Sequence, residues 1–168
     1  MIDKARLDVI WESGPDVYIH FLTDQYLSHV GGELTAETMS LLTADQHTLL
    51  AYRYLMDEVS EGGFIQLIQN GLGPYVLAGP FPMMMKKSWG LVDFGKFLYK
   101  VRKEYLSNRE SLESEKSDED FMASYEQYEK MNDYGDTFLD DWEEEVTPSI
   151  AEYVRLHESD FTIFIDKE

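Results

Sequence analysis

Residues 43–70 of the chain, TADQHTLLAYRYLMDEVSEGGFIQLIQN, carry its clearest structural pattern. Thr43 and Gln46 have the spacing of a capping box, in which each side chain accepts a hydrogen bond from the other residue's backbone amide at a helix start. Apolar residues then recur every three or four positions over 49–59, as they do on one face of a helix. Gly62 and Gly63 interrupt this repeat. The stretch therefore predicts two helices separated by a glycine turn.

Helical periodicity also dominates the remainder of the 168 residues. Helices are expected over 16–30, where a Gly-Gly pair ends the pattern, and over about 89–106. Residues 107–117 are polar and poor in core-forming side chains, so we expect a mobile connector there. Acidic helices follow over about 118–146, and Ser117 is expected to cap the first of them. A last helix is expected to open at Thr147-Pro148, because proline is favoured at the first helical position.

These patterns predict the all-α class, as a single compact multi-helix domain of residues 1–168 with a strongly acidic C-terminal helical region. Only residues 161–165, FTIFI, look strand-like, and they lie too near the end of the chain to anchor a sheet. Hydrophobic residues make up 43% of the chain and aromatic residues 14%, which is enough for a core. The aromatic excess also suggests a homodimer, because one small core does not need that much apolar surface.

The net charge of −19 excludes several classes of partner. A fold this acidic repels phosphates and anionic lipids, so no direct binding to nucleic acid or to a membrane is expected. The longest uncharged run, residues 71–85, is too short for a membrane span and contains three prolines. The N-terminus lacks the apolar stretch of a signal peptide, which favours a cytoplasmic protein. Without cysteine, disulfides and thiol chemistry are ruled out.

Most of the negative charge lies in one segment. Residues 110–145 hold 15 acids and two bases. As helix, these residues span at most ~54 Å, so their net charge per unit length approaches that of one DNA strand. Several acids recur seven residues apart, which places them on helical stripes pointing away from the apolar face, with Gly135 expected to end one helix. The predicted partner-binding acids are Asp118, Glu119, Asp120, Glu126, Glu129, Asp133, Asp136, Asp140, Asp141, Glu143 and Glu144. The alternative interpretation is an acidic helix face that serves only solubility.

The glycine turn is part of a longer motif. Residues 58–70 fit the pattern E-x-x-x-G-G-F-x-Q-x-x-x-N, whose fixed positions are Glu58, Gly62, Gly63, Phe64, Gln66 and Asn70. This block resembles the signature of a bacterial family of all-helical domains that includes DNA-mimic proteins, and the resemblance extends over roughly residues 40–160. It implies mimicry of DNA, although other relatives are implied to be immunity or antitoxin partners. The chain departs from the family at Glu61, where asparagine often precedes the glycines.

Each signature residue also has a structural interpretation. The glycines permit positive φ, Phe64 is expected to fill the core, and Gln66 and Asn70 are expected to bond the backbone at the turn. Glu58 and Glu61 flank the glycines and offer an alternative as a catalytic carboxylate pair. The structural interpretation is favoured because no set of nucleophile and base accompanies the two acids.

Other catalytic and metal-binding patterns are absent from the sequence. His20 and Asp24 share a helical face, but the four histidines form no established zinc or di-iron motif. Residues 132–136, NDYGD, lack the alternating ligands of a calcium loop, and no phosphate-binding loop or nucleophile elbow occurs. We therefore expect no enzyme activity, no cofactor and no metal.

The leading hypothesis is a non-enzymatic acidic module that mimics the DNA phosphate backbone. Carboxylates accept charge-assisted hydrogen bonds from Arg and Lys much as phosphates do. Such a module occupies the basic groove of a DNA-binding protein, for example a transcriptional regulator. The alternatives are an immunity or antitoxin-like protein that binds a basic toxin, and a structural helical domain.

Overall fold

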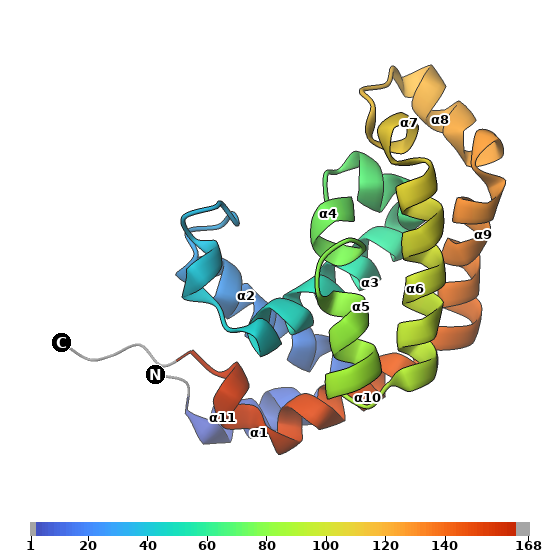
Figure 1. The fold of residues 1–168 in the computed structure, drawn as a ribbon. Helices are drawn as coiled ribbons and strands as arrows, with labels where there is room; N and C mark the ends of the chain where they lie inside the picture. The colour runs from blue at the N-terminus through green and yellow to red at the C-terminus, as the bar shows by residue number, and fades with distance from the viewer. Residues whose placement is uncertain (1–2, 164–168) are drawn as a thin grey trace. The chain divides into compact units, whose positions relative to one another are not determined.

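The computed structural model describes residues 3–163, and every regular element within that range is a helix. This confirms the all-α prediction. The chain divides into two compact units, one formed by Met1–Arg53 with Glu145–Glu168 and the other by Tyr54–Glu144. Figure 1 shows the helices in chain order. The single-domain organisation stays a prediction.

The first unit is built around buried tyrosines of α2. Its elements are α1 (Lys4–Glu12), α2 (Pro15–His29), the 3₁₀ turn η1 (Met39–Leu41), the start of α3 (Ala44–Gln69), most of α10 (Glu143–Leu156) and α11 (Glu158–Phe161). The Tyr18 hydroxyl donates to the Glu158 carboxylate at 2.7 Å, and the Tyr26 hydroxyl donates to the Phe161 carbonyl at 2.6 Å. These bonds fix α11 against α2.

The predicted capping box opens α3. The Thr43 amide donates to Gln46 Oε1 at 3.0 Å, and the Gln46 amide donates to Thr43 Oγ1 at 3.2 Å. The reciprocal pair satisfies two backbone donors that the first helical turn leaves without partners.

The second unit contains the signature block and the acidic helices. Its elements are the remainder of α3, α4 (Gly73–Val76), α5 (Phe81–Met83), the π-helical turn η2 (Met84–Ser88), α6 (Val92–Ser107), α7 (Arg109–Glu113), α8 (Asp118–Gln127), α9 (Glu129–Thr137) and the π-helical turn η3 (Phe138–Trp142). An aromatic cluster joins α6 to α9 and η3. Phe97 meets Tyr134 edge to face with ring centroids 5.9 Å apart, and stacks on Trp142 at 5.5 Å.

Two expected helix boundaries are wrong. Gly135 does not end a helix but lies buried inside α9, and the break falls at Tyr128, whose φ of −111° and ψ of 55° are not helical. Thr147 and Pro148 do not open a helix, because both lie within α10. Thr147 is buried, and its hydroxyl shares a hydrogen bond with the Tyr52 hydroxyl. The hydroxyl that was expected to cap a helix is therefore engaged in a tertiary contact.

Two further stretches differ from the sequence patterns. Residues 107–117 include α7, and its Leu112 is buried although the stretch is otherwise polar. In the strand-like stretch 161–165, Phe161 ends α11 and residues 162–163 are extended or irregular. Residues 164–165 lie outside the described residues.

Candidate partner-binding surface

The glycine pair bends α3 as the sequence predicts. Gly62 has φ −151° and ψ 19°, and Gly63 has φ 73° and ψ −174°, so the helical geometry stops at both residues. The Gly63 conformation is one that a residue with a Cβ adopts only under strain. Phe64, the next residue, is fully buried as expected.

Glu58 holds the two sides of this bend together. Its Oε2 accepts a hydrogen bond from Gln66 Nε2 at 2.9 Å and a second from Asn70 Nδ2, also at 2.9 Å. The expectation that these amides bond the backbone is therefore wrong. The bend brings Gln66 and Asn70 within reach of the Glu58 carboxylate. A charged carboxylate forms a stronger hydrogen bond than a neutral backbone carbonyl does.

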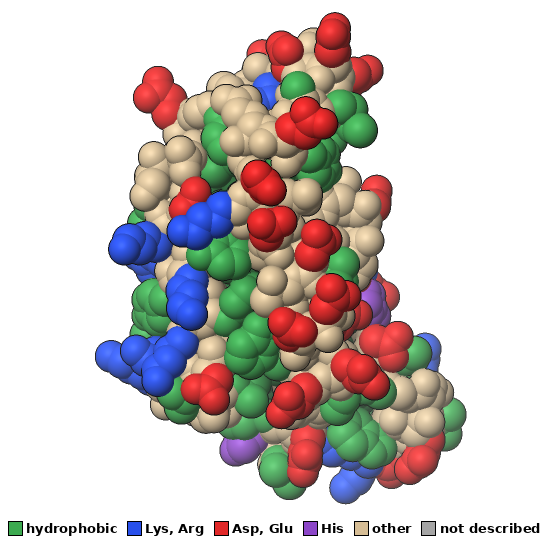
Figure 2. All heavy atoms as spheres, turned by 90° about the vertical axis from the view of Figure 1, so that its right-hand side faces the viewer, with side chains coloured by type: hydrophobic (Ala, Val, Ile, Leu, Met, Phe, Trp, Pro, Cys, Tyr) green, Lys and Arg blue, Asp and Glu red, His purple; other side chains and the backbone are tan. Residues whose placement is uncertain are grey.

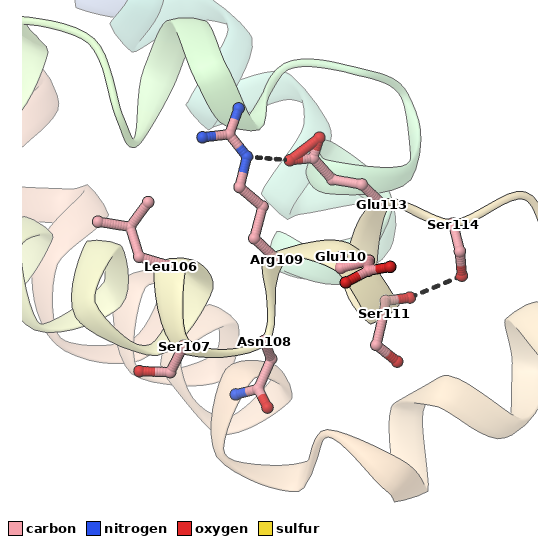
Figure 3. A pocket seen from close by; sticks show the side chains of 8 residues that line it. All are labelled: Leu106, Ser107, Asn108, Arg109, Glu110, Ser111, Glu113 and Ser114. Carbon is pink, nitrogen blue, oxygen red and sulfur yellow. Dashed lines mark hydrogen bonds and ion pairs between the residues drawn. The ribbon is translucent and has the colours of Figure 1, made fainter.

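The two acids beside the glycines have different surroundings. Glu58 is half-buried and engaged by both amides, whereas Glu61 is exposed to solvent. An open depression lies elsewhere in the unit, at the junction of α6 and α7 (Figure 3). There Arg109 Nε donates to Glu113 Oε1 at 2.6 Å, and the Tyr105 hydroxyl donates to the same oxygen. Neither Glu58 nor Glu61 is among the residues that line this depression.

The acidic helices pack directly on the bend. The Tyr125 hydroxyl of α8 donates to the Gly62 carbonyl at 2.8 Å, which connects α8 to the bend. On α9, a Cβ added to Gly135 would stand 3.3 Å from the Gly63 Cα, closer than most side-chain contacts. The absence of a side chain at Gly135 therefore allows α9 to approach the bend closely.

Four acids beyond Tyr128 share one exposed face. Glu129, Asp133, Asp136 and Asp140 follow each other at four-, three- and four-residue spacing along α9 and η3, and all four are exposed. The opposite side of the same helical path is buried, through Met131, Gly135 and Phe138. We call these four residues the acidic stripe. None of them forms an ion pair with any residue in the range 3–163.

The π-helical turn η3 changes the stripe beyond Asp140. A π turn contains one more residue than the α-helical turn it replaces, so the face of each later residue shifts by one position. The seven-residue repeat through Glu129 and Asp136 predicts that Glu143 is exposed. Because of the shift, Glu143 is half-buried and the next residue, Glu144, is exposed. Asp141 is exposed beside the stripe.

The acids of α8 form a separate group. Ser117 Oγ accepts from the Asp120 amide at 3.1 Å, which confirms the predicted helix cap. Asp118, Glu119, Asp120 and Glu126 are all exposed on α8. The break at Tyr128 separates their helical register from that of the acidic stripe, so the repeat through residues 119, 126, 133 and 140 does not form one continuous line. In Figure 2, acidic side chains form a broad band on the face shown.

Within residues 3–163, no three His, Asp or Glu side chains are grouped so that they could hold a metal ion. In the same range, every helix is too short or too polar to cross a membrane.

Comparison with known proteins matches most of the chain to one family. Residues 40–157 match the family described as DMP19-like protein. The chain is also 28% identical over 147 residues to the DNA mimic protein DMP19 of Neisseria meningitidis serogroup B, a match that covers 87% of either chain.

Proposed function

Because the chain belongs to the DMP19-like family, we propose that it is a DNA mimic, an acidic protein that occupies the basic groove of a DNA-binding protein. The family match confirms the resemblance to a family that includes DNA-mimic proteins. The proposed partner is a cytoplasmic DNA-binding protein such as a transcriptional regulator. The proposed mechanism involves no catalytic step and no cofactor.

The acidic stripe is the observation that carries this proposal. Its four carboxylates are exposed, unpaired among the described residues and held on one helix face by the aromatic packing beneath them. Arg and Lys side chains that bind phosphate can form charge-assisted hydrogen bonds with carboxylates. The acids of α8, with Asp141 and Glu144, extend the proposed contact surface beside the stripe.

The charge density supports the same conclusion. Residues 129–144 hold seven acids and one base, and 16 helical residues span about 24 Å. The segment therefore carries one net negative charge per roughly 4 Å, against about 3.4 Å of axis per phosphate in one DNA strand. A groove built to attract a DNA strand should attract this helix, with rapid association at low salt and weaker binding at high salt.

A capture experiment with matched variants tests the proposal. The wild-type protein, immobilised against a cytoplasmic lysate at low salt, should retain a basic DNA-binding protein that high salt or competing duplex DNA releases. The stripe variant E129K/D133K/D136K should lose this capture while circular dichroism remains helical. The control variant E12K/E33K/E37K changes the net charge equally at exposed acids of the first unit and should retain capture.

Three outcomes would contradict the proposal. Equal loss of capture in both variants would show that only total charge matters. Capture of no basic DNA-binding protein by the wild type would remove the mimic interpretation, and specific capture of a basic toxin would assign the surface to the immunity alternative.

A homodimer stays a separate prediction, which light scattering of the purified protein tests.

A further inference from the structure

A cluster of unpaired cations lies in the same unit as the acidic stripe. Residues 86–103 contain six bases and a single acid, Asp93, in a chain whose net charge is −19. We call the six bases the lysine strip: Lys86, Lys87, Lys96, Lys100, Arg102 and Lys103. Uniformly negative DNA has no counterpart to this feature.

Most of the lysine strip is accessible to solvent. Lys87, Lys96, Lys100 and Lys103 are exposed. Lys86 and Arg102 are half-buried against the ring of Tyr99, at 5.5 Å and 6.0 Å from its centroid. None of the six forms an ion pair with a residue in the described range 3–163.

The strip and the acidic stripe are neighbours. Helix α6, which carries four of the six cations, packs against α9 through Phe97 and Tyr134, and Lys130 of α9 pairs with Glu104 of α6 at 3.5 Å. Figure 2 shows blue side chains gathered along one edge of the face that carries the red band. Packed helices lie about 8–10 Å apart, which is close to one Debye length at physiological salt. A partner that covers the acidic stripe therefore also interacts electrostatically with the lysine strip.

A uniformly basic groove would be repelled by these cations. A groove bordered by carboxylates would be attracted to both surfaces at once, so the strip adds a repulsive element against most DNA-binding proteins and an attractive one toward a matched partner. We propose that the lysine strip determines partner specificity by pairing with acidic side chains that flank the partner's DNA-binding groove. This inference rests on the proposed function.

Nucleic acid is the less suitable occupant of the strip. A DNA duplex laid along α6 would bring its phosphates within about one Debye length of the acidic stripe, where repulsion opposes the attraction. The exposed apolar side chains at the two ends of α6, Val92 at 44% and Leu106 at 43%, also fit a protein surface better than a phosphate backbone.

The test compares how one variant changes the affinity for two probes, poly-L-lysine and the captured partner, which should respond in opposite directions. The variant K100E/K103E makes the protein more negative, so it should bind poly-L-lysine more tightly than the wild type does. If the strip pairs with carboxylates, the same variant should bind the partner purified by capture about ten-fold more weakly, as expected for the loss of two moderate ion pairs. The control variant K4E/R6E has the same change in charge in the first unit and should bind the partner at least as tightly as the wild type.

The outcomes separate this inference from the proposed function. Unchanged or tighter partner binding by K100E/K103E overturns the strip's role and leaves the mimic proposal standing. Failure of the wild type to capture any basic DNA-binding protein overturns both. Binding of a 20-base-pair duplex that K100E/K103E abolishes would assign the strip to nucleic acid, and a dimer that the variant dissociates would assign it to a second copy. Either result overturns the inference, and circular dichroism checks that each variant remains folded.

Discussion

At the scale of single residues, Glu58 stabilises the bend in α3 because one of its carboxylate oxygens accepts two side-chain amides from beyond the glycines. Glu58→Ala removes both bonds and leaves the amides of Gln66 and Asn70 without this acceptor. Hydrogen bonds to charged groups contribute about 1.5–3 kcal/mol each, and partial exposure reduces that value. We expect Glu58→Ala to lower the free energy of unfolding by about 1–3 kcal/mol in urea denaturation.

Glu61 provides the matched control for this prediction. It lies on the same helix, is exposed and also flanks the glycines. Glu61→Ala should change the free energy of unfolding by less than about 0.5 kcal/mol. Glu58→Gln should fall between the two because it retains one acceptor oxygen. Equal effects of the two alanine substitutions would show that Glu58 does not hold the bend.

Glu113 gives a pH-dependent prediction at the same scale. The hydrogen bond from the Tyr105 hydroxyl, with a further contribution from Arg109, holds the pKa of Glu113 below its ordinary value of 4.5. A pKa depressed by folding adds stability above the ordinary pKa, and that stability is lost as the pH falls through the lower folded value. Thermal unfolding should therefore show that Glu113→Gln destabilises the protein at pH 7 and has a smaller effect near pH 3. A pH-independent effect would contradict this cause.

At the scale of elements, Tyr125 connects helix α8 to the bend. Tyr125→Phe keeps the ring but removes the hydroxyl that donates to the Gly62 carbonyl. We expect a loss of about 1 kcal/mol in the free energy of unfolding, and faster amide hydrogen exchange in α8. Tyr134→Phe is the control, because Tyr134 contacts Phe97 through its ring and should tolerate loss of the hydroxyl. If both variants exchange alike, the Tyr125 bond does not anchor α8.

The elements predicted correctly are those that depend on local chemistry. The capping box at Thr43 and the cap at Ser117 involve residues three positions apart, so the sequence pattern contains all the partners. Gly135 and Thr147 were predicted wrongly because their partners are distant in sequence. Gly135 lies against Gly63, and Thr147 bonds Tyr52. Neither contact leaves a periodic signal.

At the scale of the whole molecule, the exposed acids could be predicted because helical periodicity separates them from the apolar face. The helical register that relates one group of acids to the next could not be predicted, because neither the break at Tyr128 nor the π turn η3 has a clear sequence signal. The lysine strip was missed for another reason. The first hundred residues have a small net negative charge and contain only four of the six cations, and the other two, Arg102 and Lys103, lie in the strongly acidic remainder, so neither average reveals the cluster.

The overall excess of negative charge should lower the stability of the protein. Like charges three or four residues apart on a helix destabilise it by a few tenths of a kcal/mol per pair, and the acidic stripe contains three such pairs in succession. The neutral variant E129Q/D133N/D136N should therefore melt at a higher temperature than the wild type in about 20 mM salt. Because salt screens repulsion between exposed charges, the difference should shrink near 1 M salt. If the stripe serves partner binding, the stabilised variant should also lose capture of the partner, since functional surfaces are often retained at the expense of stability. A variant that gains stability and keeps full capture would show that the stripe is only a solvated helix face.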